Sequence, residues 1–157
     1  MEPLLPERVH QRIGRPRVDD RIAFTAILFV LVTGVPWRVL PREIGCSGVT
    51  AWRRLCDWQA AGVWVRLHRE MLRRLNALGQ VDWSTGVVDA SHIRALRTGS
   101  KHHLIVERHG VPLTATLTGG HQWRPASRSQ RMRSRRKLCN ALLSLGCSLI
   151  CWRHIRP

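Results

Sequence analysis

The stretch Gly86 to Thr118, GVVDASHIRALRTGSKHHLIVERHGVPLTATLT, decides the fold that the sequence predicts. It contains three runs of β-prone residues, which are Gly86 to Leu96, Lys101 to Arg108 and Val111 to Thr118. Two turn-forming segments separate these runs, Arg97-Thr98-Gly99-Ser100 and His109-Gly110. Because short strands joined by tight turns pair with their neighbours, we expect a three-stranded meander here.

The eighty residues before the meander carry the start and stop signals of helices. Asp19 and Asp20 can cap a helix that runs from Ile22 to Val32, and Gly34 supplies its end. A short second helix is expected from Trp37 to Ile44.

Two longer helices are expected after Gly45. Ser47 offers an N-cap for a helix that reaches Ala60, with one stripe formed by Val49, Trp52, Cys56 and Gln59. A fourth, amphipathic helix follows, and its inward residues are Val63, Leu67, Met71, Leu75 and Leu78. Its outward residues are Arg66, Arg69, Arg73 and Arg74. Helices followed by a meander define an α+β fold.

The second and third helices, joined by Gly45-Cys46-Ser47-Gly48, have the shape of a helix-turn-helix. In that motif the N-terminal part of the second helix faces base edges in the major groove of DNA. Thr50, Arg53 and Arg54 occupy the first turns of this helix and are therefore candidates to contact DNA. Arginine pairs are also common on the solvated faces of ordinary helices, so a plain exposed face is the alternative.

The charge of the chain favours a polyanionic partner. Lys and Arg number 26 against 10 Asp and Glu, which gives a formal net charge of +16. A surplus of this size drives binding to nucleic acid through counterion release. RNA recognition would need aromatic residues on exposed strands, but the chain has no Tyr and only 2 Phe, both in the first helix. Double-stranded DNA is therefore the expected partner.

No segment predicts contact with a membrane. The most apolar run, Ile22 to Val32, is well short of the roughly 20 residues that span a bilayer. The chain does not start with the basic and apolar regions of a secretory signal. Its 5 cysteines are irregularly spaced, which argues against a disulfide framework. We therefore expect the protein in the cytoplasm.

A single carboxylate, Asp89, stands in the first expected strand. A carboxylate at this place opens a ribonuclease H-like catalytic core, in which carboxylates hold two Mg²⁺ ions about 4 Å apart for phosphoryl transfer. One carboxylate is weak support, because an Asp followed by a Ser is more often a turn or capping residue.

Two groups of motifs occur in order along the chain. The first group is Gly14-Arg15-Pro16-Arg17-Val18-Asp19-Asp20-Arg21, Thr33-Gly34-Val35-Pro36-Trp37-Arg38-Val39-Leu40-Pro41 and Trp58-Gln59-Ala60-Ala61-Gly62-Val63-Trp64. The second group is Val88-Asp89-Ala90-Ser91-His92-Ile93-Arg94-Ala95 and Gly99-Ser100-Lys101-His102-His103-Leu104-Ile105-Val106. They resemble the DNA-binding region and the opening of the DDE catalytic domain of bacterial insertion-sequence transposases of the family Five branch. The resemblance covers about residues 1 to 121.

This resemblance implies a helical DNA-binding domain over residues 1–80 and a partial, ribonuclease H-like DDE domain over residues 81–120. It implies that Asp89 is the first acid of the DDE triad, both catalytic residue and metal ligand, with Mg²⁺ as the cofactor. Lys101, in the Lys-His-His motif, joins Thr50, Arg53 and Arg54 as an expected DNA contact. The implied partner is the DNA of transposon ends, in association with the bacterial nucleoid.

The chain also departs from the family pattern. Only Leu96-Arg97-Thr98 stands where family members carry a longer stretch rich in Gly and Pro, and no Asp or Glu follows Glu107. The triad is therefore expected to be incomplete. A two-residue turn at Thr98-Gly99 would pair Asp89 with Arg108 and send Glu107 to the opposite face of the sheet, so Glu107 is not expected to replace a missing acid.

The basic segment from Arg124 to Lys137 has two interpretations, a flexible arm that binds phosphate or part of an out-of-frame extension. We expect residues 121–157 to be a disordered or out-of-frame tail. The sequence thus predicts a truncated transposase that binds transposon ends and is inactive in cleavage. The alternative is a non-enzymatic DNA-binding protein that represses transposition, alone, as a homodimer or paired with intact transposase.

Overall fold

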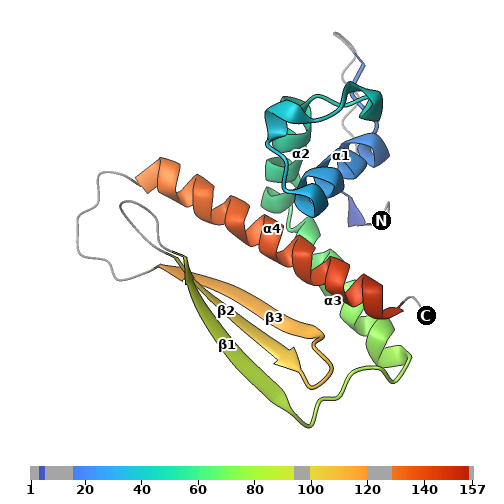
Figure 1. The fold of residues 1–157 in the computed structure, drawn as a ribbon, viewed down its shortest axis with the longest axis vertical. Coiled ribbons are helices and arrows are strands. Elements are labelled where there is room, and N and C mark those ends of the chain that lie inside the picture. Colours follow the sequence, from blue (N-terminus) through green and yellow to red (C-terminus); the bar gives the residue numbers. More distant parts are fainter. Residues whose placement is uncertain (1–3, 6–15, 94–99, 120–128, 156–157) are drawn as a thin grey trace. The chain divides into compact units, whose positions relative to one another are not determined.

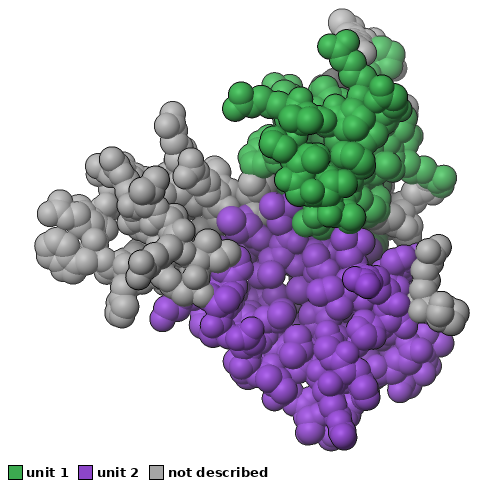
Figure 2. All heavy atoms as spheres, in the orientation of Figure 1, with its two compact units in different colours: residues 1–63 green, residues 64–157 purple. Residues whose placement is uncertain are grey.

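The computed structural model describes residues 4–5, 16–93, 100–119 and 129–155 and has the expected α+β class (Figure 1). Its α-helices are α1 (Asp20–Thr33), α2 (Gly48–Ala60), α3 (Val63–Ala77) and α4 (Ser129–Ile155). Two 3₁₀ turns, η2 (Trp37–Val39) and η3 (Arg42–Ile44), lie between α1 and α2. The strands are β1 (Gly86–Ile93), β2 (Ser100–Glu107) and β3 (Pro112–Gly119). The chain divides into two compact units, residues 1–63 and 64–157 (Figure 2).

Helix α1 starts and ends where the sequence predicts. The Asp19 side chain accepts a hydrogen bond from the backbone N–H of Arg21 at 2.7 Å, which satisfies one free donor of the first turn. Gly34 takes a left-handed conformation with φ of 69°, and its N–H donates to the carbonyl of Val30. Such a conformation is least costly for glycine, so the helix ends here.

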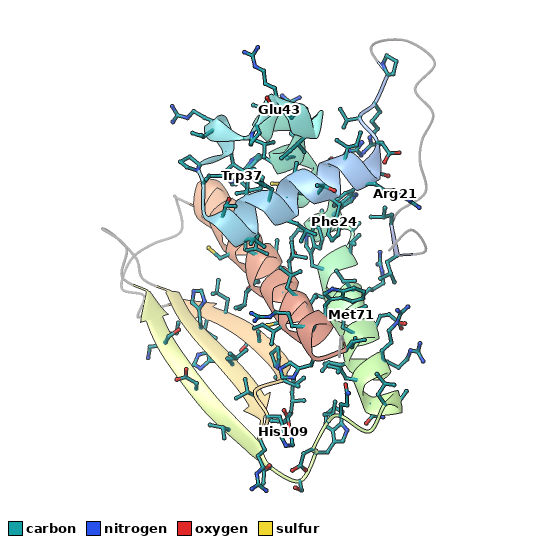
Figure 3. All side chains as sticks on the ribbon, turned by 45° about the vertical axis from the view of Figure 1, so that its right-hand side comes forward. Arg21, Phe24, Trp37, Glu43, Met71 and His109 are labelled. Atoms are coloured by element: carbon teal, nitrogen blue, oxygen red, sulfur yellow. The ribbon has the colours of Figure 1, made fainter. Side chains whose placement is uncertain are left out.

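The expected helix from Trp37 to Ile44 is wrong, because η2 and η3 take its place. Pro41 explains the interruption. It has no N–H to donate, and it keeps the residue before it, Leu40, out of the helical region, at ψ of 125°. Trp37 and Glu43, labelled in Figure 3, mark the two turns.

Helix α2 begins at the predicted cap, but its predicted stripe is the wrong one for packing. Ser47 accepts a hydrogen bond from the N–H of Thr50 at 3.2 Å. The buried residues are Ala51, Arg54, Leu55 and Trp58. Val49 and Trp52 of the predicted stripe are exposed, so that stripe faces solvent. The core of the first unit forms where Trp58 meets Phe24 of α1, with ring centroids 6.5 Å apart.

Helix α3 buries the predicted apolar face. Val63, Leu67, Met71 and Leu75 are all buried, whereas Leu78 lies beyond the last turn and is 57% exposed. One polar side chain on the buried side, His68, donates from Nε2 to the carbonyl of Pro112 at 2.8 Å. This bond joins α3 to the start of β3 within the second unit. Burial lowers the pKa of His68, so its neutral form is favoured.

The three strands form the predicted meander, in the antiparallel order β1-β2-β3. Their register differs from the prediction, because Asp89 pairs with Leu104 rather than with Arg108. The expected two-residue turn at Thr98-Gly99 lies outside the described residues. The shift is four residues, an even number, so each residue keeps its predicted face. The sheet has a bulge where Ile105 and Val106 of β2 meet β3.

Most of the tail that the sequence predicts to be disordered or out of frame forms a helix, α4, from Ser129 to Ile155. Ala141, Leu145, Cys147 and Cys151 are buried on one side of this helix. Helix α4 contacts β3 (Figure 1), whose residues Leu113, Ala115 and Leu117 are half-buried while the threonines between them are exposed. Apolar residues three and four apart gave α4 a face that the sheet could cover. The segment 120–128 lies outside the described residues, as do the side chains of 129–138.

Candidate nucleic-acid interface

The N-terminal end of α2 is held closely against η2. Gly48 packs on the backbone of Trp37, and a Cβ at this position would overlap the Trp37 carbonyl oxygen. The rings of Trp37 and Trp52 meet edge to face, with centroids 5.5 Å apart. The first turn of α2 is therefore packed closely against η2.

Arg54 lies on the inner side of α2. Its Nη2 atom is 3.3 Å from Oδ1 of Asp20, and the side chains of these residues are only 5% and 8% exposed. The same nitrogen donates to the carbonyl of Val18 at 3.1 Å. A buried charge needs a partner of this kind, because leaving it unpaired away from water is costly. Arg54 thus connects α2 to the start of α1, and its side chain is buried rather than exposed on the surface of α2.

Arg53, the neighbour of Arg54, lies on the outer side of α2 and is exposed. Thr50 is half-buried, and its hydroxyl is 2.9 Å from the hydroxyl of the capping Ser47. Val49, which is not among the predicted site residues, is 62% exposed one turn before Arg53. The helical period could have placed Val49 on the same face as Arg53, because residues four apart share a face. The outer face of α2 thus presents one cation beside an apolar side chain.

Lys101 lies at the start of β2, in the second unit. It is exposed, and it pairs in register with Thr118 on β3 and His92 on β1. On the same face of the sheet the His103 ring is bonded to the Thr118 hydroxyl at 2.9 Å. Lys101, His103 and the threonines of β3 form a polar sheet face, which is the face opposite to α4.

Asp89 lies on the other face of the sheet, in register with Leu104 and, beyond it, Ala115. It is exposed because β1 is an edge strand. Glu107 pairs with Gly86 and points to the opposite face, as predicted.

The Glu107 side chain is hydrogen-bonded within the turn between β2 and β3, near His109, which is labelled in Figure 3. Its buried carboxylate accepts hydrogen bonds from the N–H groups of His109 and Val111 at 2.8 and 3.1 Å, and from Nδ1 of His109 at 3.0 Å. Burial raises the pKa of Glu107, but these donors outweigh it and hold the pKa below its usual range. The carboxylate is a structural acceptor.

The described residues do not fit a two-metal centre. They contain no group of three His, Cys, Asp or Glu side chains placed to hold a metal ion. Asp89 stands without a second carboxylate on its face of the meander, since Glu107 is on the other. Two Mg²⁺ ions need bridging carboxylates from more than one position.

Comparison with known proteins defines the class of this chain. Residues 1–68 match a family model described as a putative transposase of the IS4/5 family. An uncharacterized 16.2 kDa protein of insertion element IS402, from Burkholderia cepacia, is 56% identical over 105 residues, which cover 64% of this chain and 71% of that protein. No solved structure gives a significant match.

These matches place the chain among insertion-sequence proteins. More particularly, it belongs to the IS4/5 family of putative transposases, which confirms the resemblance found in the sequence. Membership in a transposase family implies an interaction with DNA. None of the helices in the described ranges combines the length and apolar character needed to cross a membrane.

Proposed function

We propose that this chain binds the duplex DNA of insertion-element ends through its first unit and does not cleave it. The observation that carries the proposal is the opposite placement of Arg53 and Arg54. Arg54 holds α2 on α1 through the buried pair with Asp20, and Arg53 projects from the outer face of the helix near its N-terminus. A rigid helix with an exposed arginine in its first turns has what major-groove reading requires, since Arg pairs with guanine edges.

The first unit then acts as a variant of the helix-turn-helix, in which α1 and the two 3₁₀ turns support α2. Thr50 supports the cap, and Val49 stands where an apolar side chain meets a thymine methyl group. Lys101, on the polar face of the sheet, adds a phosphate contact from the second unit. Such a protein works at the nucleoid, in the bacterial cytoplasm.

Absence of cleavage follows from the placement of the acids. The strand that carries Asp89 corresponds by resemblance to the opening of a ribonuclease H-like domain, and no Asp or Glu follows Glu107 in the chain. Glu107 itself is bound within its turn. We propose that Mg²⁺ is not productively bound and that the triad is incomplete in this chain.

A second candidate function is repression of transposition by occupying the ends or by pairing with intact transposase. One observation favours it. Strand β1 is an edge of the sheet, and its residues Val87 and Val88 are 59% and 67% exposed. An exposed apolar edge strand is a template for pairing with another strand.

Binding of the full-length chain to DNA tests the first proposal. The probes are labelled duplexes that carry the ends of the insertion element, or the same bases in scrambled order. We expect tighter binding to the ends, and we expect Arg53→Ala to reduce that preference by about 5- to 150-fold, which corresponds to the loss of one base contact of about 1 to 3 kcal/mol. Equal binding to both duplexes, or an unchanged preference in Arg53→Ala, would contradict the proposal.

A further inference from the structure

The outer face of α3, in the second unit, carries a strip of arginines. Arg66, Arg69 and Arg73 are exposed and are spaced three and four residues apart, so they follow one line along the helix. The strip is about 10 Å long at a rise of 1.5 Å per residue. It lies opposite the buried face formed by Leu67, Met71 and Leu75. In Figure 3 long side chains with nitrogen tips extend from α3 away from the sheet.

One acidic residue of α3, Glu70, lies beside the strip and holds the Arg73 side chain in a fixed orientation. Its carboxylate accepts two parallel hydrogen bonds from Arg73, Nε to Oε2 at 2.8 Å and Nη2 to Oε1 at 3.0 Å. Arg74 donates a third from Nε at 2.9 Å. These bonds lower the pKa of Glu70 to about 2, with the bond from Arg73 as the largest cause.

Pairing with Glu70 leaves Arg73 able to bind an anion. A guanidinium has five N–H donors in a fixed plane, and Glu70 takes two of them. The Arg73 side chain is 70% exposed, so the remaining donors face solvent with their orientation already set. Holding the side chain in place reduces the entropy that a binding partner must offset.

We propose that the arginine strip of α3 binds the phosphate backbone of duplex DNA, independently of base sequence. The proposal rests on the DNA-binding function proposed above and adds a second surface to it. Charge complementarity selects this partner, because Arg69 and Arg73 are exposed on one line and Glu70 takes only two of the donors of Arg73. Arginine forms paired hydrogen bonds with phosphate oxygens, and such contacts position a protein on DNA without reading bases.

The salt dependence of binding measures these contacts. Full-length protein is titrated against a labelled random-sequence duplex at several salt concentrations, and the logarithm of affinity is plotted against the logarithm of salt concentration. Each lost phosphate contact reduces the steepness of this plot by about 0.9. We expect a reduction of about 2 for the double variant Arg69→Gln with Arg73→Gln.

The control removes the same charge elsewhere in the second unit. Arg108 and Arg153 are exposed, outside the strip, and Arg108→Gln with Arg153→Gln should change the slope by less than 0.5. The single variant Arg69→Gln preserves the Glu70 pairs with Arg73 and Arg74, and it should reduce the slope by about 0.9. Circular dichroism verifies that each variant is folded.

Equal slopes for the two double variants, or an unchanged slope in Arg69→Gln, would overturn the strip as a phosphate-binding surface. The preference for element ends, which depends on Arg53, would still stand. If the wild-type chain bound no duplex at all, the proposed function and this inference would fail together.

Discussion

Arg53 and Arg54 are adjacent in α2 and have opposite surroundings. Arg54 is buried and pairs with Asp20, whereas Arg53 is exposed on the outer face. A helix turns 100° per residue, so neighbours in sequence point in different directions and the apolar face decides which of them is buried. The two arginines look equivalent in the sequence but have different roles. Arg54 holds α2 against α1, and Arg53 presents a cation to solvent.

The first prediction compares the stability of these two variants. Arg54→Ala removes the buried guanidinium that pairs with Asp20 and donates to the carbonyl of Val18, and it should lower the free energy of unfolding by about 3 kcal/mol. Arg53→Ala should change it by less than about 0.5 kcal/mol, as is usual for exposed sites. Urea denaturation followed by tryptophan fluorescence gives both values. Equal losses in the two variants would refute the roles assigned to them.

The second prediction concerns Gly48. Gly48→Ala places a Cβ against the Trp37 carbonyl and should destabilise the protein by about 1 to 3 kcal/mol, the usual cost of overpacking. The matched control is Gly146→Ala in α4, where a Cβ meets no atom within 4 Å. That change should stabilise by about 0.5 to 1 kcal/mol, because alanine favours helix over glycine. Thermal unfolding measures both changes. A shift of the melting temperature in the same direction for both variants would contradict the prediction.

The third prediction concerns pH. Burial places the pKa of His68 in the folded protein below the ordinary value of 6.5, so folding favours the neutral ring. The unfolded chain then binds the proton more readily, and stability is lost as pH falls below about 6.5. His68→Gln keeps a donor for the Pro112 carbonyl but does not titrate. We expect the unfolding free energy between pH 7 and pH 5 to fall less in this variant than in the wild type.

The fourth prediction concerns the turn between β2 and β3. Glu107→Gln removes the buried carboxylate that accepts bonds from His109 and Val111, and it should cost about 1 to 3 kcal/mol. The pKa of Glu107 is lowered, so its contribution is present above pH 4.5 and is lost as pH falls through the lower folded value. Unfolding curves at pH 6 and pH 3 should therefore differ less in Glu107→Gln. An equal difference would show that Glu107 is not the group responsible.

The sequence predicted the elements well where local signals decide them. Asp19 and Ser47 cap their helices as expected, and the apolar spacing of α3 identified its buried side. The meander was predictable because alternating β-prone residues and turn residues leave few other arrangements. The predicted helix from Trp37 to Ile44 was wrong because Pro41 keeps Leu40 out of the helical region.

The environment of single side chains was less predictable, because it depends on residues distant in sequence. The partners of Arg54 are Asp20 and Val18, more than thirty positions away. The predicted register of β1 and β2 was wrong by four residues, because it depends on a turn and on contacts that no short motif encodes. The sheet face predicted for each residue was nevertheless right. Helix α4 was not predicted, because the loss of the family pattern after residue 121 favoured a disordered or out-of-frame tail over a packed helix in the apolar stretch from Leu138 to Trp152.

The most direct test of the account is whether the chain leaves bound DNA intact. Full-length protein is incubated with end-labelled element DNA and Mg²⁺ or Mn²⁺, at concentrations where binding is complete, and the strands are separated on a denaturing gel. We expect a fully bound duplex with no cleaved or joined product, in the wild type and in Asp89→Asn alike. Cleavage by the wild type that Asp89→Asn abolishes would show that the chain assembles a working catalytic site, and the proposal of binding without cleavage would be wrong.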